Sequence, residues 1–195
     1  MLTGGEKADL VGTTAESAMV TNEGTTFVNL YGIGDLHLPG GQDKPMDVFG
    51  DAWADHPERI RQNWLATVGE DDIVLVPGDL SWAMTLAEAE EDLAYLGSLP
   101  GTVLLIRGNH DYWWQAIGKV RRALPPGVYA LQNDHFALPG RIAVCGTRGW
   151  DLPGTDSDPH DVKVYQREVL RLEMSLQSAR AAGLEPKIAM LHYPP

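Results

Sequence analysis

Short apolar runs alternate with longer amphipathic stretches along most of this chain. Four mostly apolar runs are expected to be strands, namely 27–33, 73–76, 102–106 and 187–191. Continuous runs of Val, Ile and Leu are typical of strands that are buried on both faces. Shorter strands are expected at 128–131, 135–138 and 142–145.

The segments between these runs carry apolar residues at every third or fourth position, which predicts helices. The expected helices cover 56–68, 85–96, 113–124 and 160–182. The longest of them is expected to bury one apolar stripe, formed by Val162, Tyr165, Val169, Leu172, Leu176 and Ala179. Strands that alternate with helices in this way predict an α/β fold of stacked mixed β-sheets flanked by helices.

Local signals support the expected helix ends. Thr85 and Glu88 have the spacing of a capping box, which favours a helix that begins at Thr85. Pro57 suits a first helical turn, and Gly183 suits the residue after a helix.

The first 26 residues differ from the rest of the chain. They are rich in Gly, Thr, Ala, Glu and Ser and show little periodicity, so we expect a flexible leader outside the fold. Residues 27–195 are long enough for one domain with a substantial core.

Charge and composition narrow the possible partners. The net charge of −12 disfavours nucleic acid as a partner, because such a surface repels phosphate backbones. Cys145 is the only cysteine, which excludes an internal disulfide and favours a reducing compartment, with Cys145 as a small buried hydrophobe. No run has the length of a membrane span and no secretory signal is visible, so we expect a cytoplasmic protein without a membrane partner.

Residues that can bind metal ions follow four of the expected strands. They are Asp35, His37, Asp79, Asn109, His110 and His192. The carboxyl ends of strands in open α/β sheets are where ligands bind, so these side chains are expected at one edge. Their carboxylate, amide and imidazole groups suit Mn²⁺, Fe and Zn²⁺ equally, and one carboxylate can bridge two ions. Gly32 and Gly34 are expected to let the chain curl so that Asp35 and His37 converge.

These residues also lie in motifs that resemble the calcineurin-like metallophosphoesterase superfamily. The motifs are Gly34-Asp35-Leu36-His37, Gly78-Asp79, Gly108-Asn109-His110-Asp111 and His192. The segments 150–154 and 191–195 resemble a bacterial subgroup of small metallophosphoesterases. The resemblance implies two divalent metal ions, the first bound by Asp35 and His37 and the second by Asn109 and His192. It also implies that Asp79 bridges the two ions and that His110 acts in catalysis.

The expected activity is therefore hydrolysis of a phosphate mono- or diester in a small phosphorylated substrate. A hydroxide generated at the metal pair would attack in line, and His110 would protonate the leaving oxygen or stabilise charge in the transition state. Asp111 is expected either to fix the tautomer of His110 or to cap the helix that follows. Arg148 is expected to clamp a phosphate group or to form an ordinary salt bridge.

One departure from the superfamily pattern affects these expectations. The superfamily motif Gly-His-x-His, whose histidines complete both metal shells, does not occur in the 195 residues. We therefore expect a chain truncated at its C-terminus, without the last strand pair, with weaker metal binding and with reduced or no activity. Two alternatives stay open: a non-catalytic scaffold with an incomplete metal site, and a phosphodiesterase or nuclease that acts on nucleotides.

Overall fold

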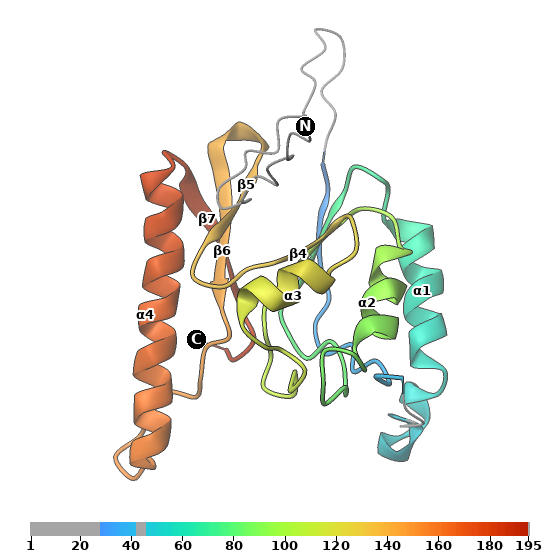
Figure 1. Cartoon of the computed structure of the whole chain (residues 1–195), viewed down its shortest axis with the longest axis horizontal. Coiled ribbons are helices and arrows are strands. Elements are labelled where there is room, and N and C mark those ends of the chain that lie inside the picture. The colour runs from blue at the N-terminus through green and yellow to red at the C-terminus, as the bar shows by residue number, and fades with distance from the viewer. Residues whose placement is uncertain (1–27, 42–45, 195) are drawn as a thin grey trace, which may run out of the picture.

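Two β-sheets face each other in the computed structural model, which describes residues 28–41 and 46–194 (Figure 1). The first sheet is entirely parallel, in the order β1 (Leu30–Gly32), β2 (Ile73–Val76), β3 (Thr102–Leu105) and β4 (Val128–Ala130). The second contains β5 (His135–Leu138), β6 (Ile142–Thr147) and β7 (Glu185–Leu191). β6 pairs antiparallel with β5 and parallel with β7, so only the second sheet is mixed. The predicted α/β class with stacked sheets is confirmed.

Helices cover the outer faces of the two sheets. The α-helices are α1 (His56–Thr67), α2 (Glu90–Gly97), α3 (Ile117–Ala123) and α4 (Pro159–Ala181). Figure 1 shows α4 alongside the β5–β7 sheet, and α1 and α2 beside the other sheet. Short 3₁₀ helices occur at η1 (Met46–Phe49), η2 (Asp51–Trp53) and η3 (Pro139–Arg141).

The strands bury both faces because successive side chains point to opposite sides. In β2, Val74 and Val76 pack in the core under the helices, whereas Ile73 packs between the two sheets. In β6, Val144 also lies between the sheets, while its neighbour Cys145 packs against α4. The layers are therefore helix, sheet, sheet and helix. Cys145 is fully buried, as predicted.

Two predicted helices begin later than expected. Thr85 and Glu88 do form the reciprocal bonds of a capping box, but they close a turn, and α2 begins at Glu90. α3 begins at Ile117 rather than at Trp113, because the preceding tryptophans make tertiary contacts from irregular backbone. The Trp113 indole donates to Asp111, and that of Trp114 donates to Gln132.

The buried face of α4 also differs from the predicted apolar stripe. Its bounds agree with the prediction to within one residue, and Gly183 follows its end with a φ of 72°. Val169, however, is 48% exposed, while the polar residues Glu168 and Ser175 are buried. Ser175 is satisfied there because it accepts a hydrogen bond from Gly146 N at 3.0 Å.

The predicted leader, residues 1–26, lies outside the described residues, as does the expected start of the first strand at Phe27. Among 28–41 and 46–194, no helix has the length and apolar character needed to cross a membrane.

Candidate metal centre

The segments that follow β1 and β2 run side by side beyond the ends of the strands. Asp35 N donates to Gly78 O at 3.2 Å, and His37 N donates to Asp79 O at 3.0 Å. The pairing ends with a parallel bridge between Leu38 and Ser81. These bonds extend the parallel register, so Asp35 and His37 lie opposite Asp79.

Asp35, His37 and Asp79 all adopt left-handed backbone, with φ of 53°, 45° and 52°. Each such non-glycine residue carries a cost of about 1–2 kcal/mol. The curl was expected at Gly32 and Gly34, but neither has a positive φ, so that part of the prediction is wrong. Strained backbone of this kind persists where the surrounding structure holds it, and it is concentrated at functional sites.

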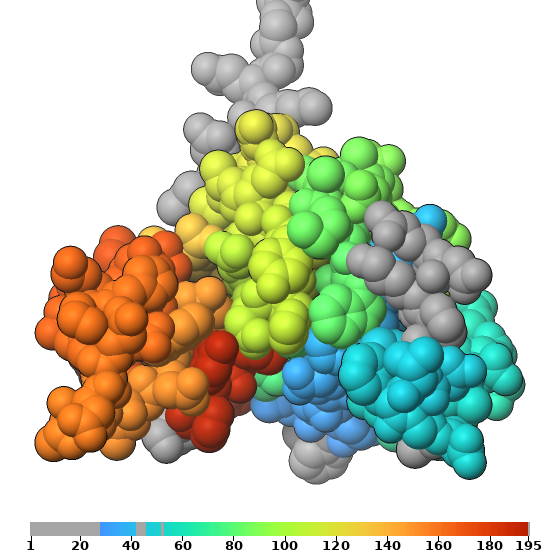
Figure 2. Space-filling view, turned by 90° about the horizontal axis from the view of Figure 1, so that it is seen from below, coloured from blue at the N-terminus to red at the C-terminus, as the bar shows by residue number. Residues whose placement is uncertain are grey.

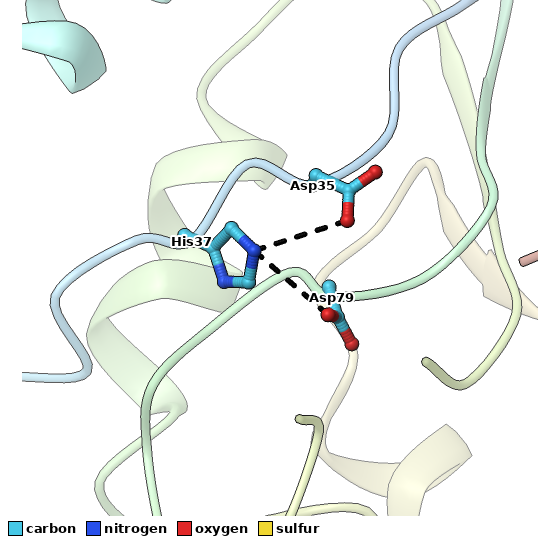
Figure 3. A group of neighbouring side chains, drawn as sticks. All are labelled: Asp35, His37 and Asp79. Carbon is cyan, nitrogen blue, oxygen red and sulfur yellow. Dashed lines mark ion pairs between the residues drawn. The ribbon is translucent and has the colours of Figure 1, made fainter. Parts of the chain in front are cut away.

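The three side chains converge as predicted (Figure 3). His37 Nε2 lies 3.8 Å from Asp35 Oδ1 and 3.8 Å from Asp79 Oδ2. One ligand atom from each residue can be chosen so that all three lie within 4.8 Å of one another. Burial lowers the pKa of His37, against the opposing effect of the two carboxylates. A neutral imidazole can offer a lone pair to a cation.

The two carboxylate oxygens of Asp79 have different surroundings. Oδ1 accepts a hydrogen bond from His110 N at 2.8 Å. Oδ2 faces two imidazole nitrogens, His37 Nε2 at 3.8 Å and His192 Nε2 at 3.6 Å. The side chain is only 3% exposed, so Oδ2 is a buried acceptor between two histidines.

His192 joins the second sheet to this group. Its Nδ1 lies 2.9 Å from Pro77 O, and its Nε2 lies 2.6 Å from Asn109 Oδ1. A neutral His192 that donates its Nδ1 proton to Pro77 leaves Nε2 as an acceptor facing an amide oxygen and a carboxylate oxygen. In that tautomer three acceptors converge and would suit a cation, and a backbone carbonyl on the other ring nitrogen is a common support for metal-binding histidines.

Two glycines allow the ligand-bearing loops to approach each other. A Cβ at Gly108 would lie 2.1 Å from Asp79 Oδ1 and 2.3 Å from Asp79 N. A Cβ at Gly78 would lie 2.6 Å from Gly108 Cα and 2.9 Å from His192 Nδ1. The space beside Asp79 therefore exists only because both positions lack a side chain.

Asp111 is completely buried and fixes the same loops. Its Oδ2 accepts from Asp79 N at 2.9 Å and from Gly108 N at 2.7 Å. Its Oδ1 accepts from Leu80 N and from the Trp113 indole, both at 2.9 Å. Burial raises the pKa of Asp111, while these bonds act in the opposite direction. These contacts position the backbone; the predicted role of Asp111 on the His110 ring stays a prediction.

His110 lies beside the cluster among aromatic rings. Its ring centroid is 5.9 Å from that of His37, 5.0 Å from that of Trp82 and 6.1 Å from that of Tyr112. Trp82 in turn stacks on His37 at 4.7 Å. The structure thus brings His110 to the metal-binding residues, and its catalytic role stays a prediction.

Arg148 lies in different surroundings from the other predicted site residues. Its guanidinium is 4.6 Å from the Trp150 ring centroid, and its Nη2 is 3.6 Å from Glu168 Oε1. Its backbone carbonyl accepts from His192 N at 3.0 Å. Arg148 therefore contacts the metal centre through its backbone, while its side chain faces a neighbouring pocket.

His56 supports the site and was not singled out by the motifs. Its Nε2 lies 3.0 Å from Leu36 O and 3.2 Å from His37 O, in the strained segment. Its ring also packs edge-on against Trp53. Because its partners are backbone carbonyls, no spacing signal in the sequence could have identified it.

The segments that follow β1, β2, β3 and β7 meet on one face of the molecule, seen from below in Figure 2. They come from both sheets, and they carry all five predicted metal ligands: Asp35, His37, Asp79, Asn109 and His192. The arrangement offers oxygen and imidazole donors to hard or borderline cations.

Comparison with known proteins gives a family match over most of the chain. A model of the family described as calcineurin-like phosphoesterase matches residues 28–195. The Gene 66 protein of Mycobacterium phage L5 is 32% identical over 118 residues, and that of phage D29 is 35% identical over 83 residues. These alignments cover 60% and 43% of this chain, and 55% and 40% of the two relatives. The chain thus spans about half the length, or less, of these curated relatives.

One solved structure is also similar. It is the crystal structure of AQ665, a protein of unknown function from Aquifex aeolicus. The alignment covers 83% of this chain and 89% of that chain, with 18% identity and a TM-score of 0.45.

Proposed function

The chain belongs to the calcineurin-like phosphoesterase family, and from this premise we propose that it hydrolyses a small phosphate mono- or diester at a site for two divalent cations. The family is metal-dependent and acts on phosphoester bonds. The Asp35, His37 and Asp79 group is a possible metal site in this chain. The number of ions, their identity and the substrate are the proposed parts.

The surroundings of Asp79 carry the proposal of two ions. Its Oδ2 faces one histidine from the first sheet at 3.8 Å and one from the second sheet at 3.6 Å. We assign Asp35 and His37 to the first cation, Asn109 and His192 to the second, and Asp79 to both. Carboxylates bridge cation pairs of about 3.5–4 Å separation in two-metal hydrolases.

Such a pair supplies Lewis-acid polarisation of the phosphoryl group and a nucleophile at neutral pH. The chain's own residues hold the geometry and move the proton. Asp111 and Gly108 fix the loop that presents Asp79. His110 is the proposed donor of a proton to the leaving oxygen, because its ring borders the cluster. The donor set suits Mn²⁺, Fe and Zn²⁺ alike.

A nucleotide diester is a second candidate substrate, favoured by the aromatic rings beside the cluster. Tyr112 is 52% exposed, and Trp82 lies between His37 and His110. A nucleobase stacked on an aromatic ring gains about 1–3 kcal/mol. The net charge of −12 favours a small nucleotide over a polymer.

Hydrolysis of p-nitrophenyl phosphate and of bis-p-nitrophenyl phosphate tests the proposal. After chelation, wild-type protein should be inactive, and added Mn²⁺ should restore turnover. Asp79→Asn should lower kcat/KM by about a thousandfold or more, because it removes the bridging charge. Asn tolerates left-handed backbone and still accepts the bond from His110 N, so the loop should persist. Asp71→Asn, at an exposed turn, is the control and should match wild type.

Two results would contradict the proposal. Turnover that survives both chelation and Asp79→Asn would show that the metal assignment is wrong. Calorimetric binding of Mn²⁺ without turnover of either ester would favour the non-catalytic scaffold.

A further inference from the structure

A polar pocket lies beside the candidate metal centre, at the same edge of the sheets. It encloses about 330 Å³ including its open mouth and lies where β3, β4 and β6 end, with α4 as one wall. Arg107, in one wall, comes two residues before Asn109. Arg148, in another, accepts hydrogen bonds from the backbone N of His192 and Tyr193. The pocket therefore shares its walls with two segments that carry metal ligands.

The pocket is positively charged in an acidic protein. Arg107, Arg148 and Arg171 line it together with one carboxylate, Glu168, whereas the whole chain has a net charge of −12. Glu168 is 1% exposed and is already engaged: Thr147 Oγ1 donates to it at 2.6 Å, and Arg171 Nη1 donates at 2.8 Å. No carboxylate of the described residues lies within ion-pair distance of Arg107. The lining thus has more cationic groups than its one carboxylate can neutralise.

Buried polar atoms without hydrogen-bond partners also belong to residues that line this pocket. Among the described residues, four buried side-chain polar atoms have no hydrogen-bond partner. Three belong to pocket-lining residues, namely Arg107 Nε, Arg148 Nε and Asn133 Oδ1, and the fourth is His37 Nδ1. A buried donor left without a partner costs about 1–3 kcal/mol. Arg107 and Arg148 therefore each have one N–H group without an acceptor, so both guanidinium groups would gain from an acceptor placed against them.

The electrostatics of Arg148 agree with this arrangement. Burial lowers the pKa of Arg148, and Arg107 acts in the same direction, while Glu168 opposes both. A guanidinium nevertheless stays charged in proteins. An incoming anion would relieve the repulsion between the two arginines as well as supply the missing acceptor.

We propose that this pocket binds an oxyanion, a phosphate or a carboxylate, through Arg107 and Arg148. Guanidinium groups match both anions with paired N–H donors. The oxyanion is either a second anionic group of the substrate, next to the ester that is hydrolysed, or a separate ligand such as inorganic phosphate. Assignment to the substrate rests on the proposed phosphoesterase function, whereas binding of the oxyanion does not.

Calorimetric titration of metal-free protein with sulfate tests the binding, at constant ionic strength set with chloride. Wild type should bind one sulfate per chain. Arg107→Gln and Arg148→Gln should each weaken binding by about tenfold, the effect of losing one charge-assisted bond. Arg180→Gln removes the same charge from an exposed position on α4 and should bind like wild type.

Glu168→Gln separates a binding pocket from a purely structural ion cluster. It removes the one carboxylate that competes with the anion but keeps the side-chain volume and an acceptor for Thr147. Binding of sulfate should therefore become tighter. Absence of saturable binding in wild type, equal weakening in Arg180→Gln, or weaker binding in Glu168→Gln would each overturn the proposal. If the arginine variants fail to fold, the sulfate affinity of Glu168→Gln still distinguishes an anion-binding pocket from a structural ion cluster.

A second experiment measures phosphate release by Mn²⁺-loaded protein, and it tests whether the oxyanion is part of the substrate or a separate ligand. Fructose 1,6-bisphosphate and fructose 6-phosphate differ only by a second phosphate. If the oxyanion belongs to the substrate, Arg148→Gln should lower the ratio of their kcat/KM values by about tenfold. An unchanged ratio with lost sulfate binding would assign the pocket to a separate ligand. No release from either compound would count against the phosphoesterase function alone, since sulfate binding is measured without it.

Discussion

The side chain of Asp111 links two loops that carry candidate metal ligands. Its two oxygens accept from the backbone N–H groups of Asp79, Leu80, Ser81 and Gly108, and from the Trp113 indole. These donors are far apart in the sequence but are drawn to one buried carboxylate. The position of Asp79 thus depends on a residue that does not contact the other ligands.

Replacement of Asp111 by alanine should therefore destabilise the protein strongly. It leaves four backbone N–H groups and one indole N–H without an acceptor in the core, and such losses reach about 3–5 kcal/mol. Urea denaturation would measure the change. Asp71→Ala, in an exposed turn, should shift the free energy of unfolding by no more than about 0.5 kcal/mol. A loss below about 1 kcal/mol in Asp111→Ala would show that the loops are held by other contacts.

Gly108→Ala should damage both the metal centre and the fold. Its φ suits any residue, but the new methyl group would lie 2.1 Å from Asp79 Oδ1 and 2.3 Å from Asp79 N, so both the side chain and the loop must shift. We expect a loss of about 1–3 kcal/mol in stability and at least about tenfold in Mn²⁺ affinity. Calorimetry of Mn²⁺ binding would measure the second effect. Gly154→Ala, where a Cβ meets open space, is the matched control, and equal affinities in the two variants would contradict the close approach.

Helix α2 is tied to the ligand-bearing segments by a buried carboxylate. Asp92 Oδ2 accepts from Gly40 N at 2.8 Å and also from the Ser81 hydroxyl. Burial raises the pKa of Asp92, while these two bonds act in the opposite direction. The folded protein therefore holds this proton to a higher pH than the unfolded chain does.

This difference in pKa predicts how the effect of Asp92→Asn on the free energy of unfolding depends on pH. The stability that the proton contributes is fully present below the unfolded pKa and is lost as pH rises through the raised folded pKa. Asn stays neutral and still accepts from Gly40 N, so the variant should gain stability relative to wild type as pH rises above the pKa of an unfolded aspartate, and the gain should level off above the raised folded pKa. Urea midpoints at several pH values would measure the difference. A constant difference, or one with the opposite sign, would mean that Asp92 is not strained by its burial.

The elements show why some features follow from sequence and others do not. β2 was predicted with the observed bounds, because a run such as Ile73–Val76 needs only burial on both faces. The motif residues were brought together as expected, because parallel strands end at a common edge. The buried face of α4 was not predicted, since the partners of Glu168 include Thr147 on β6 and Arg148 in the loop that follows it, which are far away in the sequence. Likewise, the curl at Asp35 depends on its pairing with the segment after β2.

The candidate metal centre connects the two sheets. Asp35, Asp79 and Asn109 follow strands of the first sheet, whereas His192 follows β7 of the second. A cation shared between them would bind only the assembled pair of sheets. Its binding energy is then also energy that holds the sheets together.

Added Mn²⁺ should therefore raise the free energy of unfolding, by about 2.7 kcal/mol when its concentration is a hundred times its Kd. His192→Ala should reduce this increment, because it removes the ligand that the second sheet provides, and chelation should abolish the increment in both proteins. His160→Ala, whose side chain is exposed, should keep the whole increment. Thermal or urea denaturation with and without Mn²⁺ would measure these values, and an unchanged increment in His192→Ala would place the bound ion within the first sheet alone.

The wide spacing of the ligands along the chain has a consequence for biosynthesis. Pro77, whose carbonyl faces His192, is 115 positions before it. On the ribosome, the early ligands Asp35, His37 and Asp79 emerge long before β7 exists. The nascent chain can therefore present these three side chains while His192 is still untranslated. Loop closure over such a separation is slow compared with local folding. A cation captured at that stage would be held by the early group alone, and full coordination would be among the last events of folding.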